Sequence, residues 1–161
     1  MSHYLNALKN YANFKGRTRR REYWFFMLFN SLFFIAIFLF FLVITAILSS
    51  TAPQFASSTF FLYTYFAVLG GYFLAMIVPT VSITFRRMHD SGHSGWLVVI
   101  PYILFPLYIV LTLTKLPAAV VCGLFINMAA FIISIMIFAF SLLDSSAGSN
   151  KYGDSTKYPA K

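Results

Sequence analysis

The chain reads YWFFMLFNSLFFIAIFLFFLVITAIL from Tyr23 to Leu48, without one charged side chain. A membrane-spanning helix needs about 20 predominantly apolar residues, because the hydrocarbon core of a bilayer is about 30 Å thick and each helical residue rises about 1.5 Å. The stretch therefore predicts a helix that crosses a membrane. It is longer than the roughly 7–15 apolar residues of a secretory signal peptide, so we expect it to be retained.

Three further apolar stretches follow this one. The charge-free run continues to Phe85 through a linker, Ser49–Thr59, that is rich in Ser and Thr. A lone charge and a proline at Lys115-Leu116-Pro117 indicate a tight turn between the last two stretches, with the proline suited to the first turn of a helix. The sequence predicts an all-α integral membrane protein with four transmembrane helices, at about residues 23–48, 60–85, 96–114 and 118–143.

The composition agrees with a membrane protein. The 161 residues are 60% hydrophobic and 10% charged, whereas a soluble domain has about 45–50% apolar and about 25% charged residues. The net charge of +8 lies beside the apolar segments, where positive charge normally sets membrane topology, so we expect no nucleic-acid partner. Because Cys122 is the only cysteine, an intrachain disulfide and a cysteine metal cluster are excluded, and we expect no cofactor.

The basic residues predict the orientation of the helices. If the N-terminus lies inside the cell, an even number of spans returns the C-terminus to the same side. Eleven of the 12 Lys and Arg residues then lie inside, and only Lys115 lies outside. Cytoplasmic segments normally carry this excess of Lys and Arg. Trp24 and Trp96 would both lie at the cytoplasmic interface, where aromatic rings concentrate. We therefore expect a multi-pass protein of the bacterial inner (plasma) membrane with both termini in the cytoplasm.

The two terminal segments differ in character. Apolar residues recur at helical spacing before the first span, which predicts a short interfacial helix within the basic segment 1–22: Tyr4, Leu5, Leu8, Tyr11 and Ala12. Residues 144–161 are polar and rich in Ser, Gly and Lys. That composition is typical of a flexible tail. Residues 1–161 are expected to form one membrane domain.

Small residues recur every four positions in two of the predicted spans. Ala67, Gly71 and Ala75 follow this spacing in the second, and Ala119, Gly123 and Asn127 in the fourth. Small residues let helices approach closely, so both sets indicate packing within the bundle or a homo-oligomer. An amide at mid-depth needs a hydrogen-bonding partner, which leaves open a role for Asn127 in a substrate path. Proton-coupled transport is disfavoured, because no ionisable residue lies at that depth.

The densest polar chemistry lies between the second and third spans. The sequence RRMHDSGHSGW, from Arg86 to Trp96, is predicted to form a loop of about ten residues, in which glycines permit tight turns. The loop faces the same compartment as the basic segment before the first span. Arginines can hold the phosphate groups of lipids with forked hydrogen bonds. The candidate residues for binding an anion, a lipid or a partner are Arg17, Arg19, Arg20, Arg21, Arg86, Arg87, His89 and Asp90.

Other interpretations of these residues are weaker or purely structural. His89, Asp90 and His93 could ligate a metal, but three ligands on a short loop are a weak signal, and we predict no metal site. No G-x-S-x-G motif places a nucleophile, so no catalytic residue is assigned and we expect no enzyme. The arginines could also serve as topology anchors, with Glu22, Asp90 and Asp144 as ion-pair partners.

Three sequence blocks together carry a family resemblance: FKGRTRRREYWF at Phe14–Phe25, RRMHDSGHSGW at Arg86–Trp96 and GSNKYG at Gly148–Gly153. They occur in this order over nearly the whole chain, which resembles the DUF805 family of small bacterial inner-membrane proteins. The resemblance implies a helical membrane protein and a C-terminal block docked on the cytoplasmic face. It brings no established substrate or catalytic mechanism.

The function predicted from these observations is a non-enzymatic one. We expect an inner-membrane protein whose arginine-rich cytoplasmic face binds an anionic lipid or a membrane protein partner. The alternative is a small-solute transporter, or a permeability or tolerance factor, that uses a cavity between the helices near Asn127.

Overall fold

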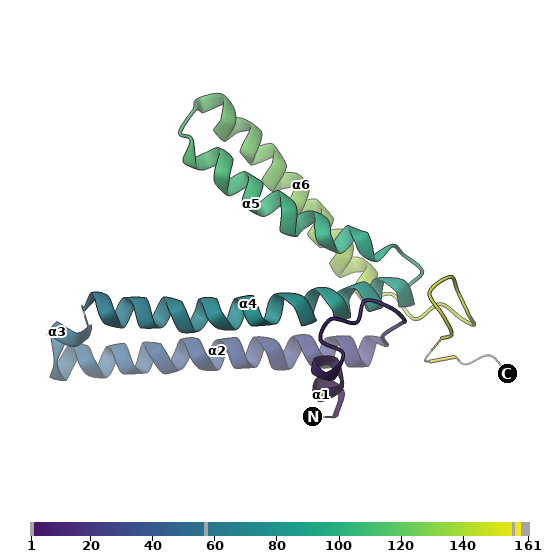
Figure 1. The fold of residues 1–161 in the computed structure, drawn as a ribbon, viewed down its shortest axis with the longest axis horizontal. Coiled ribbons are helices and arrows are strands. Elements are labelled where there is room, and N and C mark those ends of the chain that lie inside the picture. Colours follow the sequence, from purple (N-terminus) through teal and green to yellow (C-terminus); the bar gives the residue numbers. More distant parts are fainter. Residues whose placement is uncertain (1, 57, 156, 159–161) are drawn as a thin grey trace. The chain divides into compact units, whose positions relative to one another are not determined.

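The computed structural model describes residues 2–56, 58–155 and 157–158. Residue 57 of the predicted linker and residues 156 and 159–161 of the predicted tail lie outside the described residues. The regular elements of the described part are all helices (Figure 1). They are α1 (Ser2–Lys9), α2 (Arg20–Thr51), α3 (Pro53–Ala56), α4 (Thr59–Asp90), the 3-10 helix η1 (Gly95–Val98), α5 (Val99–Leu113) and α6 (Pro117–Leu142).

Four helical segments are long and apolar enough to cross a membrane, which confirms the predicted number of spans. They are α2 and α4 with 32 residues each, η1 with α5 over 19 residues, and α6 with 26 residues. Both 32-residue helices exceed the roughly 20 residues that a bilayer requires. Their polar ends therefore extend the helical backbone beyond the apolar spans.

The end of α4 corrects one prediction. Residues Arg86 to Asp90 lie on the last turns of α4 and not in a loop, which is limited to Ser91–Ser94 before η1. Gly92 ends the helix with a φ of 84°, a left-handed conformation that suits glycine. Its N–H donates to the His89 carbonyl at 3.1 Å and the next N–H, of His93, donates to the Met88 carbonyl at 2.9 Å. This pair of bonds is a Schellman cap. The helix ends where the backbone can be capped, five residues after the apolar run ends.

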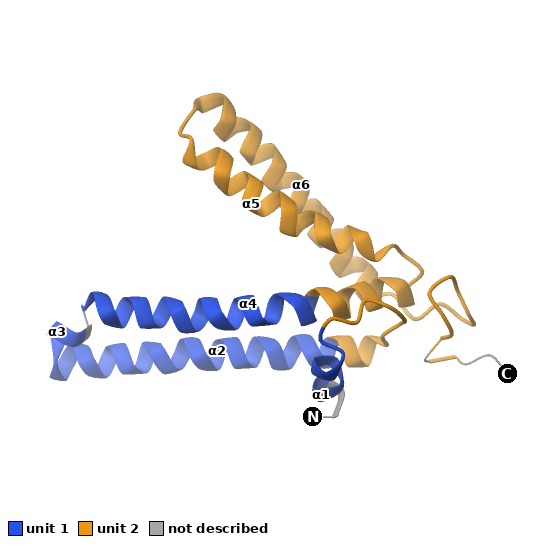
Figure 2. Ribbon diagram, in the orientation of Figure 1, with its two compact units in different colours: residues 1–11, 24–80 blue, residues 12–23, 81–161 orange. Residues whose placement is uncertain are grey.

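Two compact units divide the chain, one of residues 1–11 and 24–80 and the other of residues 12–23 and 81–161 (Figure 2). In the first unit, α2 and α4 run side by side in opposite directions, with α3 between them in sequence (Figure 1). The Phe41 ring lies 5.2 Å from the Tyr65 ring. Deeper in the hairpin, the Tyr72 hydroxyl donates to Asn30 Oδ1 at 2.7 Å. This bond supplies an acceptor for a hydroxyl group that would otherwise lie unpaired among apolar side chains.

The first unit also contains α1. Its Tyr4 ring stacks on Phe26 at a centroid distance of 5.5 Å and contacts Phe33 at 5.8 Å. After α1, the Tyr11 hydroxyl donates to the Ala75 carbonyl at 2.5 Å. The N-terminal segment therefore packs on both helices of this hairpin. The location of α1 at a membrane interface stays a prediction.

The second unit contains the hairpin of α5 and α6 and the polar ends of α2 and α4. At Gly123 on α6, an added Cβ would lie 3.4 Å from the Tyr108 ring and 3.5 Å from Leu111 Cβ, so this glycine faces α5. Gly71, in the other unit, has no atom within 4 Å of such a Cβ. Of the two glycines predicted to mediate helix packing, the described structure places only Gly123 against another helix.

A small apolar core anchors the end of α4. It consists of Phe85, Met88 and Val98. The Phe85 ring meets Phe14 edge-on at 5.3 Å and Trp96 at 5.8 Å. These contacts fix the last turns of α4 against η1, and they position the polar groups that follow.

Candidate functional site

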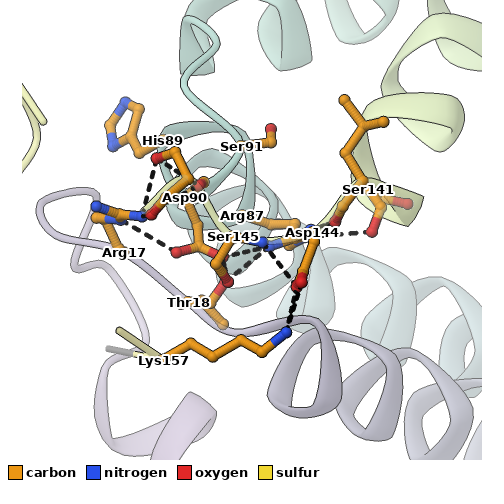
Figure 3. A network of polar contacts seen from close by, with 12 residues as sticks. Arg17, Thr18, Arg87, His89, Asp90, Ser91, Ser141, Asp144, Ser145 and Lys157 are labelled. Carbon is orange, nitrogen blue, oxygen red and sulfur yellow. Dashed lines mark hydrogen bonds and ion pairs between the residues drawn. The ribbon is translucent and has the colours of Figure 1, made fainter. Parts of the chain in front are cut away.

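The polar site lies where three segments of the second unit meet (Figure 3). Gly16, with a φ of 85°, turns the chain before α2. The N–H of Thr18 then donates to the Arg86 carbonyl at 3.1 Å, which attaches the basic segment to the end of α4. The third segment follows α6, where the N–H of Ser146 donates to the Asp90 carbonyl at 2.9 Å.

Asp90 is the centre of the site. Its Oδ1 accepts a hydrogen bond from Arg17 Nε at 3.1 Å, and its Oδ2 accepts from Arg87 Nη1. The Ser145 hydroxyl also donates to Oδ2, at 2.5 Å. The side chains of both arginines and of Asp90 have no exposed surface. A buried carboxylate is tolerated only when it is paired and hydrogen-bonded, and here both oxygens are.

The segment after α6 supplies the remaining acceptors for the two arginines. Arg17 Nη1 donates to the Gly148 carbonyl at 2.9 Å and Arg17 Nη2 donates to the Ser146 carbonyl at 2.6 Å. Arg87 Nε donates to the Ser141 carbonyl at 3.2 Å, and Arg87 Nη2 donates to the Leu143 carbonyl. One carboxylate faces two buried guanidinium groups, so these carbonyl dipoles stabilise the excess positive charge. We call Arg17, Arg87, Asp90 and these acceptors the Asp90 network.

Further contacts hold the turn at residues 150–153 against the end of α4. Residues Asn150 and Gly153 exchange backbone hydrogen bonds at 3.0 Å, and Asn150 Nδ2 donates to the His89 carbonyl at 3.0 Å. The Tyr152 ring stacks on the His89 ring at 3.8 Å with an interplanar angle of 9°. Residues Ser146 to Gly153 therefore lie against the end of α4.

Both histidines have packing partners. His89 Nδ1 lies 3.3 Å from the Gly16 carbonyl. The His93 ring stacks on Phe140 at 3.8 Å, and its Nδ1 lies 3.2 Å from the Ser91 hydroxyl. Among the described residues, no group of three His, Cys, Asp or Glu side chains gathers as metal ligands would.

The other candidate arginines lie outside the Asp90 network. Arg19, Arg20 and Arg21 are exposed. Arg86 is partly buried, and its Nε lies 3.5 Å from the Ser82 carbonyl. The structure thus divides the predicted set into the buried Arg17, Arg87 and Asp90, the stacked His89, the partly buried Arg86 and three exposed arginines.

A second ion pair lies at the surface. Lys157 Nζ donates to Asp144 at 2.7 Å and 2.5 Å, and the Tyr158 hydroxyl donates to the same carboxylate at 3.2 Å. The Lys157 hydrogen bond, followed by that from the Ser145 backbone, lowers the pKa of Asp144 to about 2. Asp144 was one predicted partner for an arginine, but its carboxylate bonds to this lysine instead.

The first unit contains an open apolar cavity between α2 and α4. It has a volume of about 430 Å³ and its lining includes Phe41, Thr45 and Tyr65. None of its lining residues comes from α6. Asn127, which is partly buried on α6, is not among its lining residues.

Comparisons with known proteins place the chain in a family. The family model of a protein of unknown function, DUF805, matches residues 11–154. The chain is 28% identical to inner membrane protein YhaI of Escherichia coli over 158 residues, which cover 98% of each protein. It is 35% identical to inner membrane protein YhaH of the same species over 106 residues, 64% of this chain and 77% of that protein. No solved structure matches. With all three polar segments of the site inside or overlapping the matched region, the chain belongs to the DUF805 family.

Proposed function

We propose that this protein is a non-enzymatic inner-membrane protein that binds anionic lipid head groups through Arg19, Arg20 and Arg21. One observation carries the proposal. These three side chains are exposed at the first residues of α2 and directly before it, whereas Arg17 and Arg87 are buried within the Asp90 network. Exposed arginines beside a membrane span attract anionic lipids by about 1 kcal/mol each.

The position of the three arginines supports a membrane ligand. Only Glu22 separates them from the apolar run that begins at Tyr23, so they lie at the level of the head groups when that run spans the bilayer. The excess of Lys and Arg around them favours the cytoplasmic side. Relatives that match nearly the whole chain are named inner membrane proteins. Together these points favour a basic face on the cytoplasmic leaflet, with both termini on that side.

The contacts of the site favour binding over catalysis. A general base must lie within hydrogen-bond reach of its substrate, but the Asp90 side chain has no exposed surface, and both of its oxygens accept hydrogen bonds from arginines. The His89 ring is covered on one face by Tyr152. Ser91 donates to the Met88 carbonyl at 3.0 Å. These side chains hold the end of α4 to the segments around it.

The lipid selectivity of the purified protein tests the proposal. The full chain is placed in phosphatidylcholine nanodiscs with a minor fraction of phosphatidylglycerol, and native mass spectrometry measures the lipids it retains. Substitution of Arg19, Arg20 and Arg21 by Gln should reduce the preference for phosphatidylglycerol by up to about 3 kcal/mol at low salt. The corresponding Lys variants keep the charges and should keep most of the preference.

Lys115→Gln is a matched control, since Lys115 is exposed at the turn between α5 and α6. It should change the preference by no more than about 1 kcal/mol, because it removes one isolated charge and not a cluster of three. An unchanged preference in the triple Gln variant contradicts the proposal. Loss of a co-purifying protein without a change in lipid selectivity would favour a protein partner instead.

A further inference from the structure

Arg86 differs from its neighbour Arg87 in one respect. Every guanidinium nitrogen of Arg87 donates to an oxygen of the Asp90 network. Arg86 Nη2 is shielded from solvent and donates to no acceptor among the residues that the structure describes. Its Nε makes only the long, 3.5 Å contact with the Ser82 carbonyl. Buried polar groups are nearly always hydrogen-bonded, so an unpaired guanidinium nitrogen indicates that an acceptor is missing.

The surroundings of Arg86 are strongly positive. The Thr18 backbone bond to the Arg86 carbonyl brings the beginning of α2, with its three exposed arginines, to this end of α4. Burial lowers the pKa of the Arg86 guanidinium, and the negative charge of Glu22 opposes this shift. Outside the Asp90 network, these two helix ends carry four arginines and one carboxylate, Glu22. The missing acceptor is expected to carry negative charge.

We infer that Arg86 is the specific ligand of a phosphate group, with the exposed arginines at the beginning of α2 providing the attractive field around it. The guanidinium fork matches two phosphate oxygens, and such charge-assisted bonds are about 2.7–2.9 Å long. Binding exchanges the long contact with Ser82 for these bonds. Since Nη2 is shielded, the guanidinium group turns outward when the ligand binds. The residue as a whole is only partly buried.

The phosphate can belong to a membrane lipid or be free in solution. Arg86 directly follows the apolar run that ends at Phe85, so its level in the membrane is that of the lipid phosphates. The chemistry of recognition is the same for both sources, because the guanidinium contacts only the phosphate oxygens. The experiment below separates them.

This inference rests on the proposed lipid binding. The salt dependence of lipid retention distinguishes the Arg86 site from the general attraction by the exposed arginines. Raising the salt concentration from about 0.1 M to about 1 M shortens the screening length from about 10 Å to about 3 Å. Attraction by the exposed arginines is lost under these conditions, whereas a direct fork contact persists. Wild-type protein in nanodiscs of phosphatidylcholine with phosphatidylglycerol should therefore retain some phosphatidylglycerol at high salt.

The Arg86→Gln variant should lose this salt-resistant retention by about tenfold or more, as expected for hydrogen bonds to a charged group. Arg86→Lys keeps the charge without the fork and should lose most of it as well. Glu22→Gln removes the competing carboxylate and should increase retention. The triple Gln variant at residues 19–21 should lose mainly the salt-sensitive part. If the triple Gln variant keeps the salt-sensitive retention, the proposed function is contradicted. If Arg86→Gln keeps the salt-resistant retention unchanged, the Arg86 site is overturned.

A second probe identifies the source of the phosphate. Inorganic phosphate is added to wild-type protein in nanodiscs of phosphatidylcholine alone, and the thermal unfolding midpoint is measured. A rise in wild type that is absent in Arg86→Gln supports a site for free phosphate. No rise, together with salt-resistant retention of phosphatidylglycerol, supports the lipid phosphate. If Arg86→Gln does not elute as a single folded species, the Arg86→Lys and Glu22→Gln variants test the site. If both retain phosphatidylglycerol at high salt to the same extent as the wild type, the inference is overturned.

Discussion

Asp90 has a larger structural role than its single charge suggests. Two buried arginines and one serine hydroxyl donate to its carboxylate, and its carbonyl accepts the Ser146 N–H. Removing one partner of a buried ion pair leaves an uncompensated charge, whereas the intact pair contributes little net stability. Breaking the Asp90 network therefore lowers stability mainly because it leaves buried charges unpaired.

We predict that Asp90→Asn destabilises the protein by about 3–5 kcal/mol, because it leaves two buried guanidinium groups without a carboxylate. The free energy of unfolding, measured in mixed micelles by titration with a denaturing detergent, checks this value. Asp154→Asn is the matched control, since Asp154 is exposed in the same unit, and it should change stability by less than about 0.5 kcal/mol. Equal effects of the two substitutions would contradict the assigned role of Asp90.

The pairing of Asp90 illustrates what sequence reasoning missed at this scale. Glu22, Asp90 and Asp144 were equally plausible partners for the arginines, since each lies beside a predicted span. Arg17 and Asp90 are 73 positions apart, and no local pattern marks such a pair. The carbonyl acceptors after α6 had no signal of their own, because every residue carries a carbonyl. The GSNKYG block pointed to the right segment but not to its bonds.

Among the elements, α4 best shows the limit of apolar runs as predictors. The run ends at Phe85, but the helix continues to Asp90. Arg, Met and His are all compatible with a helix, and the backbone first adopts a left-handed conformation at Gly92. Apolar character predicts which part of a helix crosses the membrane, and capping residues predict where the helix ends. The four spans were predictable for the first reason, and the extension of α4 could have been predicted for the second.

Gly95 in η1 and Gly123 in α6 should respond differently to substitution by alanine. A Cβ on Gly95 would lie 2.8 Å from Cγ of Phe85 and still closer to the ring edge, and that ring is held by Phe14 and Trp96. We predict that Gly95→Ala destabilises the protein by about 1–3 kcal/mol through overpacking. At Gly123, the nearest atoms lie at 3.4 Å and 3.5 Å, in ordinary contact.

Gly123→Ala should therefore be nearly neutral or slightly stabilising, since alanine also favours the helix. Thermal unfolding of the two variants in the same detergent checks the comparison. If Gly123→Ala is the more damaging of the two, α5 and α6 approach each other more closely than the structure shows.

At the scale of the whole molecule, both compact units contain parts of the same two helices. The unit boundaries fall between Tyr23 and Trp24 in α2 and between Thr80 and Val81 in α4. The polar ends of these helices belong to the unit that carries the site, and their apolar parts belong to the other. The Asp90 network joins the segment before α2 to the ends of α4 and α6, which requires these three parts of the chain to lie on one side of the membrane.

This requirement gives a prediction of topology. Reporter fusions after Thr51 and after Lys161 should lie on opposite sides of the membrane, since α4, α5 and α6 all follow Thr51. A fusion after Lys115 should lie on the same side as the one after Thr51. Paired reporters, one active in the cytoplasm and one active outside it, make the assignment. Equal results after Thr51 and Lys161 would refute the four-span arrangement.

The acceptors from Ser141 to Gly148 also impose an order of events during synthesis. Arg17 and Arg87 leave the ribosome well before the segment whose carbonyls receive their hydrogen bonds. Domains fold as the chain emerges, beginning with the earlier residues. The two arginines therefore remain hydrated while the membrane spans insert, and they are buried only after α6 has been synthesised. Chains cut short before this segment lack most of the carbonyl groups that accept hydrogen bonds from the two arginines, which distinguishes them from the finished protein.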